Sequence, residues 1–135
     1  MTDAARAFHY YRTHVSKPVL VVEDHEELRE TLRVLLADEG FEVVTAENGR
    51  IALDRLEEIA HPCVVLLDLM MPVMDGLTFL KAAREAHPDL KVALLTAAPP
   101  NHDVGADFTL KKPFRLPEVL RIVSDLCTKP AEAKN

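Results

Sequence analysis

Short apolar segments alternate with amphipathic segments along the chain. In two of them, residues 19–22 and 63–67, apolar positions follow one another without polar interruption. Strands that are buried on both faces, as in parallel sheets, have this pattern. The apolar segments predict strands at residues 18–23, 41–46, 62–68, 90–96 and 106–111.

Helical periodicity marks the segments between these strands. Leucines at positions 28, 32, 35 and 36 share one helical face, and Gly40 is expected to end that helix. We expect further helices over residues 48–60, around residues 77–83 and over residues 116–127, with Pro117 in the first turn of the last one. Strands that alternate with helices predict a doubly wound α/β fold with a parallel sheet and right-handed crossovers.

The connection between the fourth and fifth predicted strands is short. Only residues 97–105 separate Thr96 from Ala106, and they include Pro99 and Pro100. A parallel crossover usually needs about 10–12 residues including its helix. A helix of this length would advance only about 14 Å, whereas the return along a strand needs roughly 20 Å. We therefore expect a largely extended connection without a regular helix, more mobile than the others.

Residues that can carry chemistry lie at the ends of the predicted strands. Glu23 and Asp24 lie at the end of the first strand, Asp68 of the third, Thr96 of the fourth and Lys112 of the fifth. In doubly wound folds the site lies at the carboxyl ends of the strands. Converging carboxylates repel each other, and Mg²⁺ with oxygen ligands would offset that repulsion. A carboxylate beside Mg²⁺ can form an aspartyl phosphate, with an ammonium and a hydroxyl at the phosphoryl oxygens.

Each of these residues has a simpler interpretation when it is taken alone. Asp24 precedes a helix and could be its N-cap, and it could serve both purposes. Asp68 could be a turn residue, Thr96 a strand-end hydroxyl and Lys112 a solvated loop lysine. Their joint appearance at successive strand ends favours a phosphoryl-transfer site. The histidines show no metal-ligand spacing and are expected to be dispersed on the surface.

Four segments resemble the receiver domains of bacterial response regulators. The segment Val21-Val22-Glu23-Asp24 is similar to their acid-pair strand, and residues 68–76 (DLMMPVMDG) are similar to their phosphoacceptor loop. Residues 94–97 (LLTA) resemble the strand that carries their conserved threonine. Residues 105–107 followed by 110–114 (LKKPF) resemble their last strand and lysine. The resemblance covers residues 18 to about 127.

The resemblance implies a flavodoxin-like five-stranded sheet of order 2-1-3-4-5, here with the fourth helix reduced or missing. It implies that a histidine kinase or histidine phosphotransfer protein phosphorylates Asp68. It further implies that Asp24, Asp68 and the Met70 backbone carbonyl bind Mg²⁺, that Glu23 binds it through water, and that Thr96 and Lys112 hold the phosphoryl group. Such a chain catalyses only its own phosphorylation and dephosphorylation, and it signals to a downstream protein.

Two departures from the family support an alternative function, namely the short fourth crossover described above and the residue at position 109. Receiver domains usually have Tyr or Phe three positions before the lysine, where this chain has Thr109. Phe108 is adjacent, but strand alternation directs it to the other face. The alternative is a receiver-like interaction module whose output is independent of phosphorylation. A small phosphatase of the haloacid-dehalogenase type is disfavoured, because Met70 stands where that class has a second acid.

Outside the receiver region, residues 1–17 form an N-terminal extension and residues 128–135 a C-terminal tail. In the extension, Ala4, Phe8, Tyr11 and Val15 recur with helical spacing. We expect either a frayed start or a helix that packs on the domain or on a second copy, the latter giving a homodimer.

Composition and charge limit which binding partners and which cellular compartment we expect. The net charge of −6 argues against direct nucleic-acid binding. There is no apolar run of about 20 residues that could span a membrane, and no secretory signal in residues 1–17. We therefore expect a cytoplasmic protein. Cys63 and Cys127 lie in apolar runs far apart in the sequence, and we expect buried thiols without a disulfide.

Overall fold

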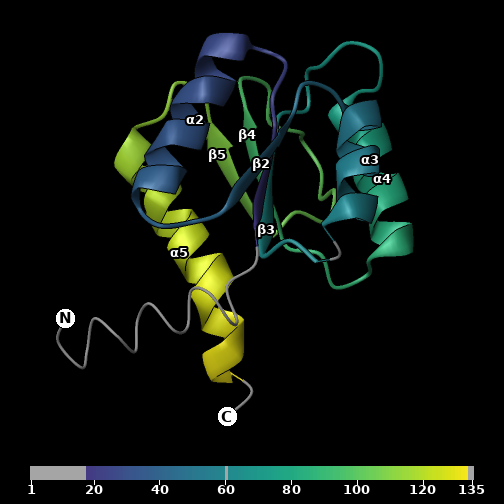
Figure 1. The fold of residues 1–135 in the computed structure, drawn as a ribbon. Helices are drawn as coiled ribbons and strands as arrows, with labels where there is room; N and C mark the ends of the chain where they lie inside the picture. Colours follow the sequence, from purple (N-terminus) through teal and green to yellow (C-terminus); the bar gives the residue numbers. More distant parts are fainter. Residues whose placement is uncertain (1–17, 60, 134–135) are drawn as a thin grey trace, which may run out of the picture.

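A five-stranded parallel sheet forms the centre of the computed structural model, which describes residues 18–59 and 61–133 (Figure 1). The strand order is β2-β1-β3-β4-β5, which confirms the predicted order and fold class. Every neighbouring pair is parallel. The strands are β1 (Val19–Val22), β2 (Val43–Ala46), β3 (Val64–Leu67), β4 (Val92–Thr96) and β5 (Phe108–Lys111).

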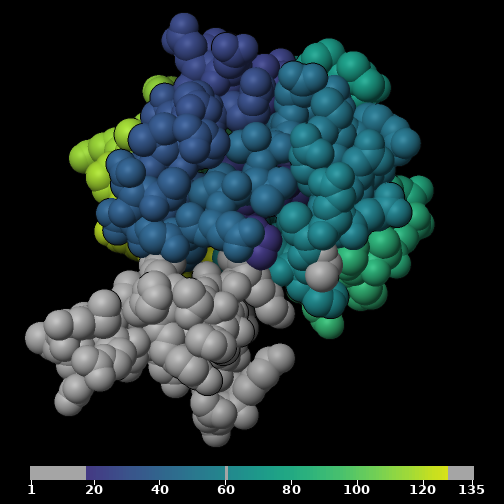
Figure 2. Space-filling view, viewed as in Figure 1, coloured from purple at the N-terminus to yellow at the C-terminus, as the bar shows by residue number. Residues whose placement is uncertain are grey.

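Within residues 18–59 and 61–133, four helices cover the two faces of this sheet. They are α2 (Glu26–Asp38), α3 (Gly49–Glu58), α4 (Gly76–Ala86) and α5 (Leu116–Ala133). Helices α2 and α5 lie on one face and α3 and α4 on the other (Figure 1). The space-filling view looks at the edge of the sheet formed by β2, with α2 on one side of that edge and α3 on the other (Figure 2). The central strands β1, β3 and β4 therefore lie between two layers of helices.

Alternate residues of each central strand enter two separate cores. In β1, Leu20 and Val22 pack toward α3 and α4, whereas Val19 and Val21 pack toward α2 and α5. All four side chains are buried. Burial of one such side chain contributes about 1.5–3 kcal/mol. The uninterrupted apolar sequence of these strands follows from the presence of a core on each face.

Helix boundaries follow local sequence signals. Gly40 has a φ of 96°, a conformation that favours glycine, and it follows the end of α2. Asn48 caps α3 by accepting a hydrogen bond from the Ile51 N–H. The suggestion that Asp24 caps α2 is wrong. The N-cap residue is His25, which makes no side-chain capping bond, and the helix begins at Glu26. The His25 N–H donates to the Glu23 carboxylate.

The connection between β4 and β5 contains no helical segment, as its length predicts. Arg84 of α4 holds this connection in place. Its guanidinium donates hydrogen bonds to the backbone carbonyls of Leu90 and Gly105. It also forms an ion pair with Asp107 at 3.5 Å, and the Asp107 carboxylate accepts a hydrogen bond of 2.7 Å from the Val92 N–H. One side chain therefore ties the end of the short crossover, before β5, to the segment that precedes β4.

A disulfide joins Cys63 and Cys127, so the expectation of free thiols is wrong. The first residue precedes β3 and the second lies in α5, and their Cα atoms are 4.9 Å apart. Although the two positions are 64 residues apart in sequence, α5 packs across the amino end of β3. Sequence distance gave no indication of this proximity.

The structure tests the prediction for the C-terminal end of the chain but not the prediction for the N-terminal extension. Helix α5 continues to Ala133, six residues beyond the expected start of the tail after residue 127, and residues 131–133 are of types that favour helix. The N-terminal extension, residues 1–17, lies outside the described residues, so its predicted helix stays a prediction.

Candidate functional site

The predicted site residues meet at the carboxyl edge of the sheet. The strand ladder continues one residue past three strands and fixes their backbones there. The Glu23 N–H donates to the Ala46 carbonyl at 3.0 Å, and the Asp68 N–H donates to the Val22 carbonyl at 3.1 Å. The Lys112 N–H donates to the Thr96 carbonyl at 2.9 Å. Residues that are distant in sequence are thus held side by side by backbone bonds.

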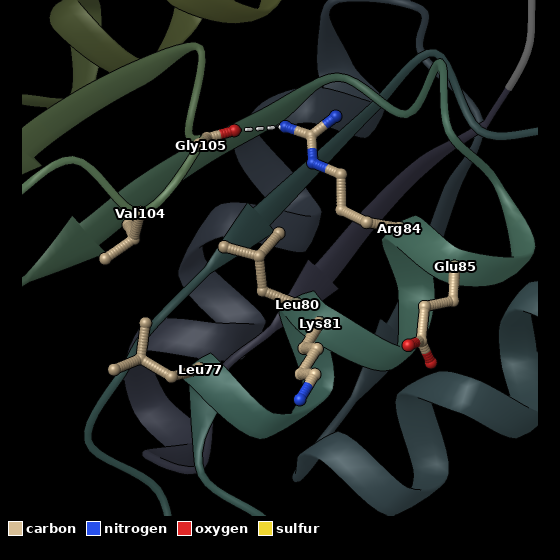
Figure 3. Close-up of a pocket in the computed structure, with 7 residues that line it drawn as sticks. All are labelled: Leu77, Leu80, Lys81, Arg84, Glu85, Val104 and Gly105. Atoms are coloured by element: carbon tan, nitrogen blue, oxygen red, sulfur yellow. Dashed lines mark hydrogen bonds between the residues drawn. The ribbon is translucent and has the colours of Figure 1, made fainter.

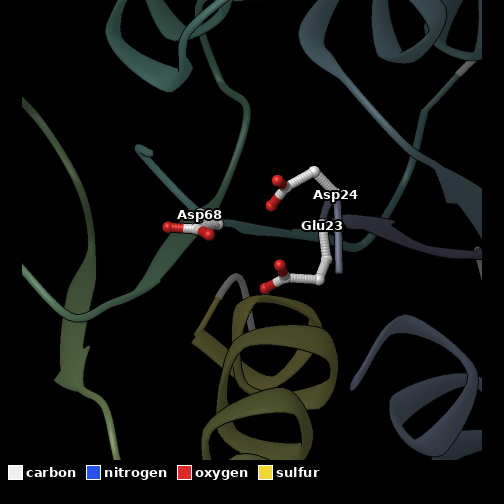
Figure 4. A group of neighbouring side chains, drawn as sticks. All are labelled: Glu23, Asp24 and Asp68. Carbon is white, nitrogen blue, oxygen red and sulfur yellow. The ribbon is translucent and has the colours of Figure 1, made fainter. Parts of the chain in front are cut away.

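Three carboxylates converge at this edge (Figure 4). Glu23, Asp24 and Asp68 each offer an oxygen, and these oxygens lie within 4.8 Å of one another. Glu23 is 2% exposed and Asp68 is 5% exposed, whereas Asp24 is exposed to solvent. Buried carboxylates at this separation repel each other unless positive charge or hydrogen bonds compensate.

Lys112 bridges the two buried carboxylates. Its Nζ donates to Glu23 Oε1 at 2.9 Å and to Asp68 Oδ2 at 3.2 Å. Backbone N–H groups serve the remaining oxygens. The His25 N–H donates to Glu23 Oε2 at 3.0 Å, and the Met70 N–H donates to Asp68 Oδ1 at 3.1 Å. Each buried carboxylate therefore has one bond from the ammonium and one from the backbone of its own loop.

Burial and pairing shift the pKa values of Glu23 and Lys112. Burial raises the pKa of the Glu23 carboxyl above its ordinary value of 4.5, and hydrogen bonds from Lys112 and the His25 N–H reverse only part of that shift. Burial by itself would lower the pKa of Lys112, but its interactions with Glu23 and then Asp68 outweigh burial and raise that pKa above 10.5. The lysine therefore stays charged at neutral pH.

Thr96 and Met70 are the other two residues that the sequence predicts for this site. Thr96 ends β4 and is fully buried. Its Oγ1 accepts a hydrogen bond of 3.3 Å from the Ala98 N–H, which leaves its own hydroxyl hydrogen to donate. Met70 is 64% exposed, two residues beyond Asp68. The structure brings together the carboxylates and Lys112 as predicted, while the roles of Thr96 and of the Met70 carbonyl stay predictions.

Two further residues shape the site and were not predicted. The Arg29 guanidinium on α2 donates to the backbone carbonyls of Glu23 and Asp24 at 3.0 and 3.4 Å. Asp75 caps α4 by accepting a 2.8 Å hydrogen bond from the Thr78 N–H. An acid directly before a helix is a recognisable capping signal. The position of Arg29, five residues beyond the acid pair, shows its role only once the helix is placed.

The donor set fits a hard divalent cation. All of the converging ligand atoms are carboxylate oxygens, which Mg²⁺ and Ca²⁺ prefer over nitrogen or sulfur. Three carboxylates exceed the positive charges of Lys112 and Arg29. The exposed position of Asp24 leaves one side of the cluster open to water, and Mg²⁺ usually keeps several waters. Mg²⁺ is therefore compatible with these residues on chemical grounds.

Solved structures of receiver domains are similar to this fold. A response regulator protein, TrrA, from Thermotoga maritima, solved in complex with Mg²⁺–BeF, matches with a TM-score of 0.74 and 35% identity. The match covers 82% of this chain and 98% of that chain. The chemotaxis protein CheY4 of Vibrio cholerae matches with a TM-score of 0.76 and 32% identity over the same shares of the two chains.

Sequence comparison identifies the same family. The response regulator MprA of Mycolicibacterium vanbaalenii is 41% identical over 108 residues, which cover 76% of this chain and 46% of that protein. The chain thus spans about half the length of the curated relatives it matches. The family model described as the response regulator receiver domain matches residues 19–124. The chain belongs to the response regulator receiver domain family.

Proposed function

We propose that the chain is the phosphoacceptor of a two-component or phosphorelay system and that Asp68 accepts the phosphoryl group. The observation that carries the proposal is the buried Asp68 carboxylate. It lies among the acids Glu23 and Asp24, and Lys112 donates a hydrogen bond to it. A phosphorylated histidine of a kinase or phosphotransfer protein is the proposed donor. Membership of the receiver family supports this assignment.

The proposed reaction moves one phosphoryl group between two side chains. An Asp68 oxygen attacks the phosphorus of the donor phosphohistidine, a P–O bond forms, and the P–N bond breaks with its electron pair returning to the imidazole. Lys112 already donates a hydrogen bond to Asp68 and is close enough to bind the phosphoryl oxygens once they are attached there. The Thr96 hydroxyl donates to one of those oxygens. Later attack by water releases phosphate and restores the carboxylate, so no external substrate is turned over.

The proposed cation is Mg²⁺, held by Asp24, Asp68 and the Met70 carbonyl, and by Glu23 through water. When bound it would neutralise charge on the phosphoryl oxygens and on the converging acids. The chain's own contribution is to hold the ligands at one edge: β1 positions the acid pair, β3 positions Asp68, and Arg29 fixes the turn after β1 through two carbonyls.

We further propose that the signal leaves through contact with a downstream protein in the cytoplasm. No helix within the described residues is long and apolar enough to cross a membrane. The full-length relatives are about twice as long as the matched region, and their names describe a response regulator and, for a Haemophilus influenzae relative, a transcriptional regulatory protein.

Intact-mass measurement after incubation with acetyl phosphate and Mg²⁺ tests the phosphoacceptor assignment. We expect the mass of one phosphoryl group on the wild-type chain and none on Asp68→Asn. Asp75→Asn is the matched control, because it changes an acid of the same loop while asparagine preserves the cap of α4. Equal labelling of Asp68→Asn and wild type would contradict the assignment.

A second candidate function rests on Thr109. The register pairs Leu94 with Thr109 and Ala93 with Phe108. Leu94 belongs to the core facing α3 and α4, and Ala93 to the opposite core, so Thr109 occupies the face where the family has an aromatic residue. Output that ignores phosphorylation would leave the backbone amide NMR shifts of β4 and β5 unchanged by beryllofluoride and Mg²⁺. Large changes there would favour the phosphorylation-dependent function.

A further inference from the structure

A groove lies where the crossover lacks a helix. Leu77 and Leu80 of α4 face Val104 across it, and Arg84 and Gly105 close one end with their hydrogen bond (Figure 3). The cavity has a volume of about 420 Å³. Leu77 is 42% exposed. The groove is mainly apolar and open to solvent, in a position that a crossover helix would otherwise cover.

The neighbouring strand does not supply a cover for this groove. On the face of β5 that points toward the α3 and α4 layer, the register places Thr109 and Lys111, both exposed. These polar residues tolerate water on the uncovered face of β5. The apolar surface that lacks a cover on this face is therefore the stripe between α4 and Val104. A single short amphipathic segment is sufficient to cover that stripe.

We propose that the chain's own residues 1–17 dock in this groove through the stripe Ala4, Phe8, Tyr11 and Val15. Amphipathic helices bind apolar grooves through side chains that are spaced three and four residues apart. The side chains of this stripe, two of them aromatic, have that spacing. The segment joins the domain at Pro18, directly before β1. It therefore starts at the amino edge of the sheet, the edge at which Arg84 and Gly105 mark the end of the groove.

The connecting chain is long enough for this docking. The groove is two strand spacings from β1, about 10 Å, and one helical layer above the sheet, about 10 Å. Phe8 precedes Pro18 by ten residues, which reach about 15 Å as a helix and about 33 Å when extended. The required separation of about 15 Å lies within that range, so neither a long linker nor a second copy is needed.

Charge favours the association as well. Residues 1–17 contain Arg6, Arg12 and Lys17 against Asp3, a net charge of +2. Because the whole chain carries −6, residues 18–135 carry −8. Opposite net charge keeps the segment close to the domain, and the apolar stripe then selects the groove. This inference does not depend on phosphorylation of Asp68.

The substitution Phe8→Trp gives the test a single reporter, because the sequence contains no tryptophan. In the full chain we expect blue-shifted emission that acrylamide quenches poorly. Leu77→Glu in the same chain introduces a charge into the groove and should lower the ratio of docked to free segment by at least about tenfold, which corresponds to 1.4 kcal/mol. Emission should then shift to the red and quenching should increase.

Val34→Glu is the matched control. Val34 on α2 is 43% exposed, close to the 42% of Leu77, and α2 covers the opposite face of the sheet. This control should leave the emission unchanged. Solvent-like emission in the parent chain, or equal effects of both glutamates, would overturn the proposal. Emission that changes with protein concentration would identify a second copy as the occupant and overturn docking within one chain.

Discussion

Reduction of the disulfide between Cys63 and Cys127 should lower the free energy of unfolding substantially. The bond closes a loop of 64 residues. In the chain-entropy description, a crosslink across a loop of this length destabilises the unfolded state by about 4 kcal/mol at 25 °C. Both cysteines pack beside the core that faces α2 and α5, so the reduced thiols remain packed. The expected loss therefore comes mainly from the greater freedom of the unfolded chain.

Urea unfolding with and without a phosphine reductant measures this loss. A domain of this size has a total stability of about 5–15 kcal/mol, so about 4 kcal/mol is a large fraction. With a urea dependence of about 2 kcal/mol per molar, the midpoint should fall by about 2 M on reduction. A chain with both cysteines replaced by serine should unfold near the reduced midpoint and should not respond to reductant.

Thiol titration decides how the outcome is interpreted. Two reactive thiols in the oxidised, unfolded chain would show that the disulfide does not form. An intact disulfide with an unchanged midpoint would refute the entropic reasoning. Labelling of Asp68 should be the same in both redox states, because five residues of extended chain, about 16 Å, separate it from Cys63 at the other end of β3.

Two further changes test the packing and charge of the site. A Cβ at Gly76 would lie 2.6 Å from the Leu69 Cα and 2.7 Å from the Asp68 carbonyl oxygen. Gly76→Ala should therefore cost about 1–3 kcal/mol in urea unfolding and slow acetyl phosphate labelling; unchanged values would show that the loop yields freely. The raised pKa of Lys112 contributes stability that is present below pH 10.5 and is lost as pH rises through the folded pKa. As pH rises through that alkaline range, the free energy of unfolding should therefore fall less for Lys112→Met than for wild type or Lys111→Met. Parallel curves of unfolding free energy against pH for the three chains would count against the ion pairs.

The sheet and its acidic edge could be predicted because the signal is local. Uninterrupted apolar runs identify strands with a core on both faces, and parallel strands bring the residues after Val22 and Leu67 to one edge. The missing crossover helix followed from chain length alone. In each case the prediction needed only the order of residues and the dimensions of regular backbone.

Contacts that depend on the packing of distant side chains could not be predicted in this way. The disulfide required α5 to cross the amino end of β3, and the anchoring role of Arg84 required α4 to lie beside the crossover. Sequence position alone suggests Asp24 as a possible cap of α2. The Glu23 carboxylate instead binds the His25 N–H, which is a side-chain choice that residue order does not specify.

The anchoring of the crossover by Arg84 links the chemistry to the local unfolding of an edge strand. Strand β5 reaches the sheet through residues that Arg84 holds at Gly105 and Asp107, and Lys112 is the first residue beyond that strand. Local opening free energies range from about zero to the global stability. If this segment opened, β5 would leave the sheet and Lys112 would leave Asp68. The fraction of time during which Asp68 is paired with Lys112 would then depend partly on the Arg84 guanidinium at the opposite edge of the sheet. A substitution of Arg84 would thus alter the site while every site residue stays unchanged.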